Sequence, residues 1–184
     1  MKKQVVWKGL YYQIMEYCNI ETTDTDIRID GTIVGVADDL PLSVTYDIVT
    51  DSAWRVASLE MAIEQGGECT WISIQRDPDG KWTQSGHARP EWADCIDIDI
   101  SLTPFTNTLP INRLRPGPTE RTRLDVLYIN VLKGEIKPVE QHYTRLSENV
   151  YLYEGVVRDF KAELTVDEDG VVTTYPELFT RLQS

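Results

Sequence analysis

The stretch that decides the fold runs from Asp94 to Leu114 and reads DCIDIDISLTPFTNTLPINRL. Isoleucines alternate with aspartates over 96–100, and this period of two is typical of a β-strand with one apolar and one polar face. Pro104 and Pro110 then remove two backbone donors, so the chain cannot continue as a regular central strand. We therefore expect a strand that ends in an ordered connection rich in threonine and asparagine.

The same alternation recurs elsewhere in the chain. Apolar and polar residues alternate over 42–48 and 160–166, and more weakly over 27–33, where Gly31 and Gly35 predict a bulge or a bend. By contrast, 124–132 is apolar at nearly every position, as in a strand that is covered on both faces. Strands therefore dominate the predicted secondary structure.

Two Asp-Gly turns, at 77–80 and 167–170, predict β-hairpins because glycine adopts the positive φ that tight turns require. They would join the strands 69–76 with 81–84 and 160–166 with 171–175. The one candidate helix is 176–182, which starts at Pro176. We predict a mainly β fold, with α+β as the alternative. Its antiparallel curved sheet would form a spiral roll or half-open barrel with few short helices, in a single domain over 1–184.

Composition excludes several classes of function. The 184 residues include 18 Lys and Arg against 30 Asp and Glu, which gives a formal net charge of −12. A chain this acidic repels nucleic acid and anionic lipid surfaces. Its hydrophobic content of 41% is typical of a globular protein and not of a disordered one.

Metal, disulfide and membrane signals are absent from the sequence. The three cysteines are far apart, with no CxxC pair, and only two histidines occur. We therefore predict no metal site, no cofactor and reduced thiols. No apolar run approaches the roughly 18 residues of a membrane helix. Lys8, Gln13 and Glu16 interrupt any apolar signal segment, so the expected location is cytoplasmic.

The strand at 96–100 places two carboxylates, Asp97 and Asp99, on one face, where each can raise the pKa of the other. They could be metal ligands, an acid/base pair, acceptors for sugar hydroxyls or simply a solvated strand face, and Arg113 could neutralise one of them. The connection that follows offers an apolar side chain at Phe105 and an amide at Asn107. It is either a self-contained crossover or the wall of a cleft.

The stretch 94–114 closely resembles the signature of a bacterial family described as "Putative glycolipid-binding". Three further segments, 46–55, 141–144 and 167–176, resemble other parts of the family pattern, so the likeness spans nearly the whole chain. It departs at Asn112, where a second basic residue would be expected before Arg113. The resemblance implies a spiral β-roll, similar in shape to the half-barrels of bacterial lipoprotein carriers, and glycolipid binding.

We therefore predict non-enzymatic binding of an amphipathic small molecule, with a glycolipid as the implied ligand, in the concavity of a curved sheet. No catalytic or metal-ligating residue is assigned. The expected ligand contacts are Trp54, Arg55, Asp97, Asp99, Phe105, Asn107, Arg113, Gln141 and Tyr143.

Two other functions stay open from the residues alone. Asp97 and Asp99 with Arg113 could serve a hydrolase that acts on a glycoside or a polar lipid head group. Alternatively, an exposed sheet edge could serve a protein-interaction domain. The sequence does not set the oligomeric state.

Overall fold

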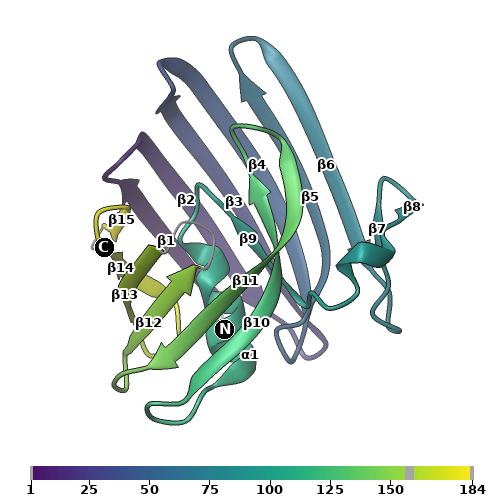
Figure 1. Cartoon of the computed structure of the whole chain (residues 1–184). Coiled ribbons are helices and arrows are strands. Elements are labelled where there is room, and N and C mark those ends of the chain that lie inside the picture. Colours follow the sequence, from purple (N-terminus) through teal and green to yellow (C-terminus); the bar gives the residue numbers. More distant parts are fainter. Residues whose placement is uncertain (1, 156–159, 183–184) are drawn as a thin grey trace.

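The computed structural model describes residues 2–155 and 160–182, which form one curved sheet of 15 strands (Figure 1). The strands are β1 (Lys2–Gly9), β2 (Gln13–Thr22), β3 (Asp26–Ala37), β4 (Leu40–Asp51), β5 (Val56–Gln65), β6 (Glu68–Arg76), β7 (Trp82–Gln84), β8 (His87–Ala88), β9 (Asp97–Ile100), β10 (Arg121–Asn130), β11 (Glu135–Arg145), β12 (Val150–Gly155), β13 (Phe160–Val166), β14 (Val172–Tyr175) and β15 (Phe179–Arg181). The helical elements are the 3₁₀ turns η1 (Pro90–Trp92) and η2 (Phe105–Asn107) and the helix α1 (Thr108–Leu114).

The strand order is β8-β7-β6-β5-β4-β3-β2-β1-β15-β14-β13-β12-β11-β10-β9. Strands β1 to β8 follow one another as antiparallel neighbours, and β1 then pairs with β15 on its other side. The two ends of the chain therefore meet in the middle of the sheet. The mainly β, antiparallel curved sheet expected from the sequence is confirmed.

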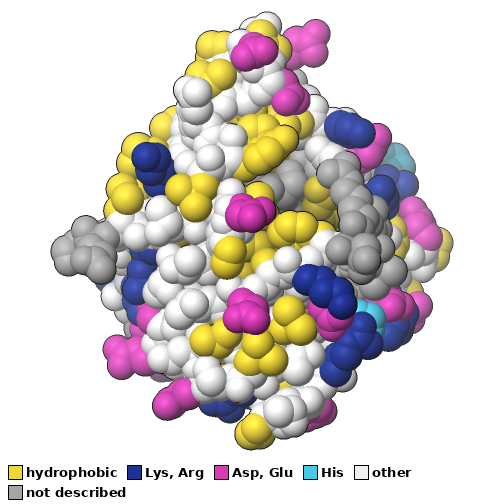
Figure 2. Space-filling model, turned by 60° about the vertical axis from the view of Figure 1, so that its left-hand side comes forward, with side chains coloured by type: hydrophobic (Ala, Val, Ile, Leu, Met, Phe, Trp, Pro, Cys, Tyr) yellow, Lys and Arg dark blue, Asp and Glu magenta, His cyan; other side chains and the backbone are white. Residues whose placement is uncertain are grey.

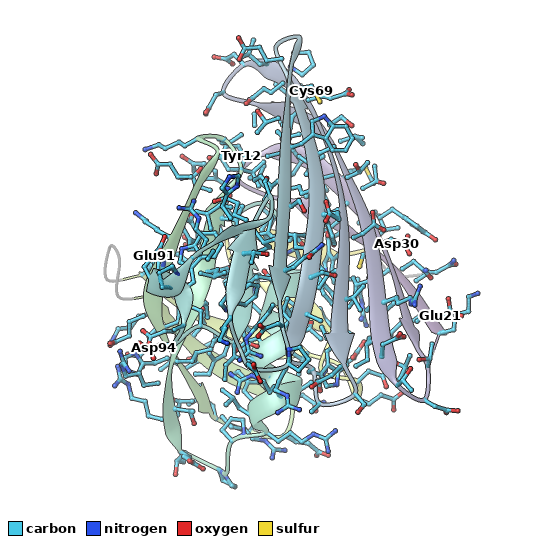
Figure 3. All side chains as sticks on the ribbon, turned by 90° about the vertical axis from the view of Figure 1, so that its right-hand side faces the viewer. Tyr12, Glu21, Asp30, Cys69, Glu91 and Asp94 are labelled. Carbon is cyan, nitrogen blue, oxygen red and sulfur yellow. The ribbon has the colours of Figure 1, made fainter. Side chains whose placement is uncertain are left out.

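Helix α1 lies between the long strands β1–β6 and the strands β10–β12, as two views of the ribbon show (Figures 1 and 3). The concave face of the sheet is therefore turned toward this helix. Alternation fills that face with apolar side chains, such as Val44, Ile48 and Leu59. Polar side chains such as Glu21 and Asp30 project from the outer face of the long strands (Figure 3).

Strand β9 ends the sheet and is parallel to β10, whereas every other pair of neighbouring strands described is antiparallel. The connection between them, which contains η2 and α1, supplies the crossover that a parallel pair needs. In β10, Val126, Leu127 and Ile129 are all buried, as expected for a strand covered on both faces.

Three local expectations differ from the structure. The terminal helix over 176–182 is wrong: Glu177 has a φ of 65° in a turn, and β15 follows. The connection after β9 contains a helix, which the two prolines did not lead us to expect. Pro110 is compatible with this helix because it falls in the first turn of α1, where proline is tolerated. Of the bulge or bend predicted at Gly31 and Gly35, the bulge does not occur, because the register of β3 is unbroken on both sides. Gly31 is instead required by the Tyr46 ring, which lies where a Cβ would be.

Candidate functional site

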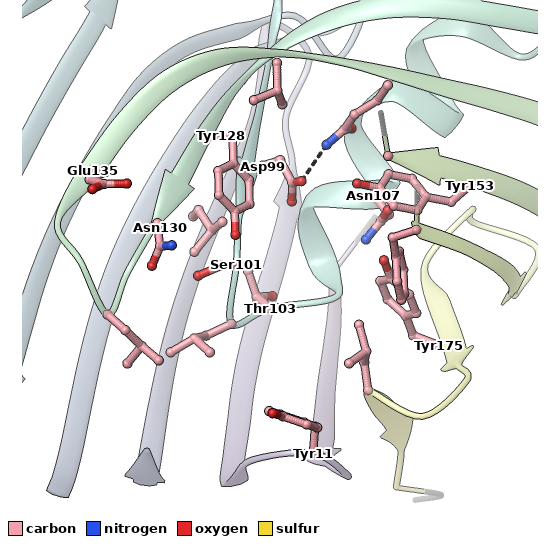
Figure 4. A pocket seen from close by; sticks show the side chains of 18 of the residues that line it. Tyr11, Asp99, Ser101, Thr103, Asn107, Tyr128, Asn130, Glu135, Tyr153 and Tyr175 are labelled. Atoms are coloured by element: carbon pink, nitrogen blue, oxygen red, sulfur yellow. Dashed lines mark hydrogen bonds between the residues drawn. The ribbon is translucent and has the colours of Figure 1, made fainter. Parts of the chain in front are cut away.

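A partly open cavity of about 550 Å³ lies on the concave side of the sheet. Residues from the β1–β2 turn, β9 and its following loop, β10, β11, β12, β14 and β15 line it, so distant parts of the chain meet there (Figure 4). Its volume falls within the range of roughly 300–1,000 Å³ that is usual for small-molecule sites.

Asp99 is the charged group at the inner wall of this cavity. Gln141 Nε2 donates to its Oδ2 at 2.6 Å (Figure 4). Thr106 Oγ1 donates to its Oδ1 at 3.2 Å. Burial raises the pKa of Asp99, and these two hydrogen bonds partly oppose that shift. No lysine or arginine of the described chain lies within 4.0 Å of the carboxylate. Asp99 is thus oriented but has no ion-pair partner.

Asn107 is held beside Asp99 by its own hydrogen bonds. Its Nδ2 donates to the Pro104 carbonyl at 3.1 Å, and its Oδ1 accepts from the Tyr143 hydroxyl at 2.7 Å. These two hydrogen bonds explain why an asparagine stands at position 107, because its side chain joins the turn η2 to β11. Thr103 contributes similarly, since its hydroxyl accepts from the Phe105 amide at 2.9 Å.

Aromatic rings form a continuous ladder along one side of the cavity. Ring centroids lie 5.4 Å apart for Tyr143 and Tyr153, 6.2 Å for Tyr153 and Tyr175, and 6.3 Å for Tyr175 and Phe179. These distances are typical of edge-to-face packing. Tyr153, Tyr175 and Phe179 line the cavity, as does Tyr128 from β10. The cavity therefore combines aromatic surface with carboxylate and amide groups.

The two aspartates that share one face of β9 have separate roles. Asp97 is fully buried, and Arg113 of α1 contacts both of its oxygens, with Nη2 at 2.5 Å from Oδ2. Asp97 does not line the cavity, whereas Asp99 does. The ion pair therefore holds α1 against β9, and Asp99 is the member of the pair that faces the void.

The nine expected contact residues divide into three groups. Asp99, Asn107 and Gln141 line the cavity. Asp97, Arg113, Phe105 and Tyr143 lie behind it, in the ion pair, the core and the aromatic ladder. Trp54 and Arg55 lie in the β4–β5 turn, at the opposite end of the strands from the β1–β2 turn, and Arg55 binds Asp51 at 2.7 Å. The departure from the family pattern, Asn112, donates to the Asp169 carbonyl at 2.9 Å.

Sequence reasoning missed the residues that the curl of the sheet brings in. Tyr11 and Tyr12 of the β1–β2 turn lie at the cavity with Phe179 of β15. No local sequence pattern predicts that these residues lie close together, because β1 and β15 pair across almost the full length of the chain. A signal did exist for Glu16, an acid at an inward position between Ile14 and Cys18.

Glu16 is buried directly behind the cavity wall. Thr103 Oγ1 donates to its Oε1 at 2.6 Å, and the Tyr46 hydroxyl donates to the same oxygen. Among the described residues, Oε2 has no hydrogen-bond partner. Burial raises the pKa of Glu16 to about 8, and the two hydrogen bonds oppose this shift. Glu16 thus links strands β2 and β4 to the loop that carries Thr103.

Charges at the cavity are sparse and mixed in sign. Lys133, Lys137, Glu135 and Asp38 are exposed residues of its outer part. On the face shown in Figure 2, acidic side chains are scattered among several separate apolar groups.

The described residues contain no group of three or more side chains suited to a metal ion. None of the helices described is long and apolar enough to span a membrane.

Comparisons with known proteins agree with this architecture. Residues 4–181 match the model of a family described as "Putative glycolipid-binding". A crystal structure of a DUF1089 family protein from Pseudomonas aeruginosa is similar, with 33% identity and a TM-score of 0.80, over 91% of this chain and 92% of that one. A search of curated proteins found no match. Because the family model covers almost the whole chain, the protein belongs to the "Putative glycolipid-binding" family.

Proposed function

We propose that the cavity binds an amphipathic small molecule with a sugar head group, and that the protein acts by binding and not by catalysis. The observation that carries this proposal is the composition of the cavity wall. Aromatic rings, amides and the carboxylate of Asp99 face the same void of about 550 Å³, and further charged side chains lie at its exposed part. Sugars pack against aromatic faces and exchange hydrogen bonds with such polar groups, and an alkyl chain gains roughly 0.8 kcal/mol per buried methylene.

The separation of Asp97 from Asp99 supports binding over hydrolysis. A glycosidase of the usual type needs two carboxylates on either side of the scissile bond. Here Arg113 neutralises Asp97 behind the wall, and Asp99 alone of the two lines the cavity. The family description is consistent with a glycolipid ligand. The cytoplasmic location expected from the sequence stays a prediction.

The test is native mass spectrometry of the protein after incubation with a total lipid extract and removal of unbound lipid. We expect adducts whose fragments contain a hexose and an acyl or alkyl chain. A Ser101→Phe variant, which puts a ring into the cavity, should lose these adducts. A Ser58→Phe variant, at an outward position of β5, should keep them. Adducts that persist equally in both variants, or no adduct on the native protein, would contradict the proposal.

A further inference from the structure

The two ends of the cavity differ in chemistry and in exposure. The inner end contains the carboxylate of Asp99, the amides of Asn107 and Gln141, and the rings of Tyr153 and Tyr175. All of these are buried except Asp99, which is partly buried. The outer end contains Tyr11, which is 73% exposed. Figure 4 shows Tyr11 across the cavity from Asp99.

The inner end is suited to a head group that donates hydrogen bonds and has no negative charge. Gln141 and Thr106 orient the Asp99 carboxylate. They leave acceptor capacity on it, because a carboxylate has about four acceptor positions. The lysines of the cavity, Lys133 and Lys137, are exposed, and neither is within 4.0 Å of the Asp99 carboxylate. A phosphate placed beside Asp99 would therefore be repelled without a compensating cation, whereas sugar hydroxyls would donate to it.

One side of the way out of the cavity, beside the β1–β2 turn, is apolar. The amide of Leu10 donates to the Leu178 carbonyl at 2.8 Å, which fixes the β1–β2 turn next to the β14–β15 turn. Leu178 and Phe179 line the cavity on this side. Leu10 is 51% exposed beside Tyr11. An alkyl chain that leaves the inner end thus passes apolar side chains as far as solvent.

We propose that the ligand binds head first: an uncharged, hydroxylated head group at Asp99, with the alkyl chain running outward past Tyr11. This rests on the proposed function and adds to it the orientation of the ligand and the class of its head group. It is the reverse of a carrier that buries the chain and leaves the head in water. Buried amides and the carboxylate of Asp99 lie at the inner end, whereas at the outer end Tyr11, Leu178 and Phe179 offer apolar surface on one side, next to exposed charged side chains.

The test uses hexyl and octyl β-glucoside and octyl phosphate, each titrated calorimetrically below its micelle concentration. A methylene that becomes fully buried tightens binding by about fourfold. Two fully buried methylenes would therefore give a factor of about 16. We expect octyl glucoside to bind roughly tenfold more tightly than hexyl glucoside, because the two added methylenes lie at the outer end of the cavity and are only partly buried. We expect octyl phosphate to bind more weakly than either.

Two pairs of variants locate the ends of the ligand. Asp99→Asn should weaken both glucosides by the same factor, about tenfold for a lost bond to a charged acceptor. In the same variant, the ratio of the affinity for octyl glucoside to the affinity for octyl phosphate should be smaller than in the native protein. Tyr11→Ser should weaken octyl more than hexyl glucoside, so that their ratio falls. Asp24→Asn and Tyr17→Ser, at exposed positions that do not line the cavity, are the matched controls.

The outcomes distinguish a failure of the proposed ligand orientation from a failure of the proposed binding function. A change of the octyl-to-hexyl ratio in Asp99→Asn, with both glucosides weakened equally in Tyr11→Ser, would show the reverse orientation. It would overturn the head-first proposal while the binding function stood. No binding of either glucoside to the native protein would overturn both. If Asp99→Asn does not fold, Tyr11→Ser decides the orientation alone, because it changes an exposed turn residue.

Discussion

At the scale of single residues, Glu16 connects the cavity wall to the long strands through hydrogen bonds. Because it is a buried carboxyl group, it makes the free energy of unfolding depend on pH. Its pKa is about 8 in the folded protein because it is buried, against about 4.5 for the ordinary side chain. Between these values the folded protein holds a proton that the unfolded chain releases, so the free energy of unfolding falls as the pH rises. Burial beside Tyr46 and Cys18 gives this carboxyl no cation that would reverse the shift.

We predict that Glu16→Gln removes this slope. The native protein should lose up to about 1.4 kcal/mol per pH unit from this group between pH 4.5 and 8. Urea unfolding at a series of pH values measures the difference between native protein and variant. Glu64→Gln, at an exposed position of β5, is the control and should leave the slope unchanged. Parallel curves for native protein and Glu16→Gln would show that Glu16 is not protonated in the folded state.

Gly31 is a second residue whose identity the structure dictates. The ring of Tyr46 occupies the place of a Cβ at this position. We predict that Gly31→Ala lowers stability by roughly 1–3 kcal/mol, as for other overpacked sites. Denaturant unfolding provides the measurement. Gly117→Ala, whose nearest neighbour is the flexible Glu120 side chain at 3.2 Å, should change stability much less. Equal losses at both positions would refute the packing argument.

At the scale of elements, the short helix α1 is held in the concavity by a buried ion pair. A helix of this length is marginal by itself. Arg113 supplies its tertiary anchor at Asp97. Replacement of Arg113 leaves an uncompensated buried charge, which costs roughly 3–5 kcal/mol.

We therefore predict a large loss of stability for Arg113→Met, and partial recovery in the double variant Asp97→Asn/Arg113→Met. Thermal unfolding measured on the four members of this cycle gives the coupling between the two residues. Arg115→Met removes an exposed cation at the end of the same helix and serves as the control. A double variant no more stable than Arg113→Met alone would mean that the charge of Asp97 is not the cause.

Local patterns predicted the elements far better than their assembly. Alternation revealed β9, β4 and β13, and Asp-Gly turns gave two hairpins, because these depend on neighbours in sequence. The helix α1 was missed because Pro110 was taken as a residue that excludes regular structure, whereas it lies in the first turn of the helix, where proline is tolerated. Strand β15 was mistaken for a helix because its extended backbone depends on pairing with β1. Asp99, Asn107 and Gln141, which local patterns and the family resemblance singled out, line the cavity, and their role as ligand contacts stays a prediction. Tyr11 was missed because its place at the cavity depends on the pairing of β1 with β15.

At the scale of the whole molecule, the sheet depends on the junction between its halves. Strand β15 pairs with β1 at Trp7, Lys8 and Gly9. Ion pairs of Lys3 and Arg181 with Asp167 reinforce this junction.

We predict that a chain ending at Glu177 melts roughly 10 °C lower, since loss of a buried aromatic such as Phe179 alone costs about 3–5 kcal/mol. Differential scanning calorimetry gives the melting temperature. Hydrogen exchange should also accelerate at the amides of 7–9. Thr180→Ala keeps the backbone pairing and is the matched control. A truncated chain with unchanged protection at these amides would show that β15 does not hold β1.

The pairing of β1 with β15 also has a consequence for biosynthesis. Strand β1 is synthesised long before β15, so one of its edges has no partner until β15 has also been made. During that interval the edge can pair with another nascent chain, as exposed strand edges do. Contacts between such distant residues also slow folding. Chaperone dependence in the cell should therefore follow the time needed to synthesise the C-terminal half.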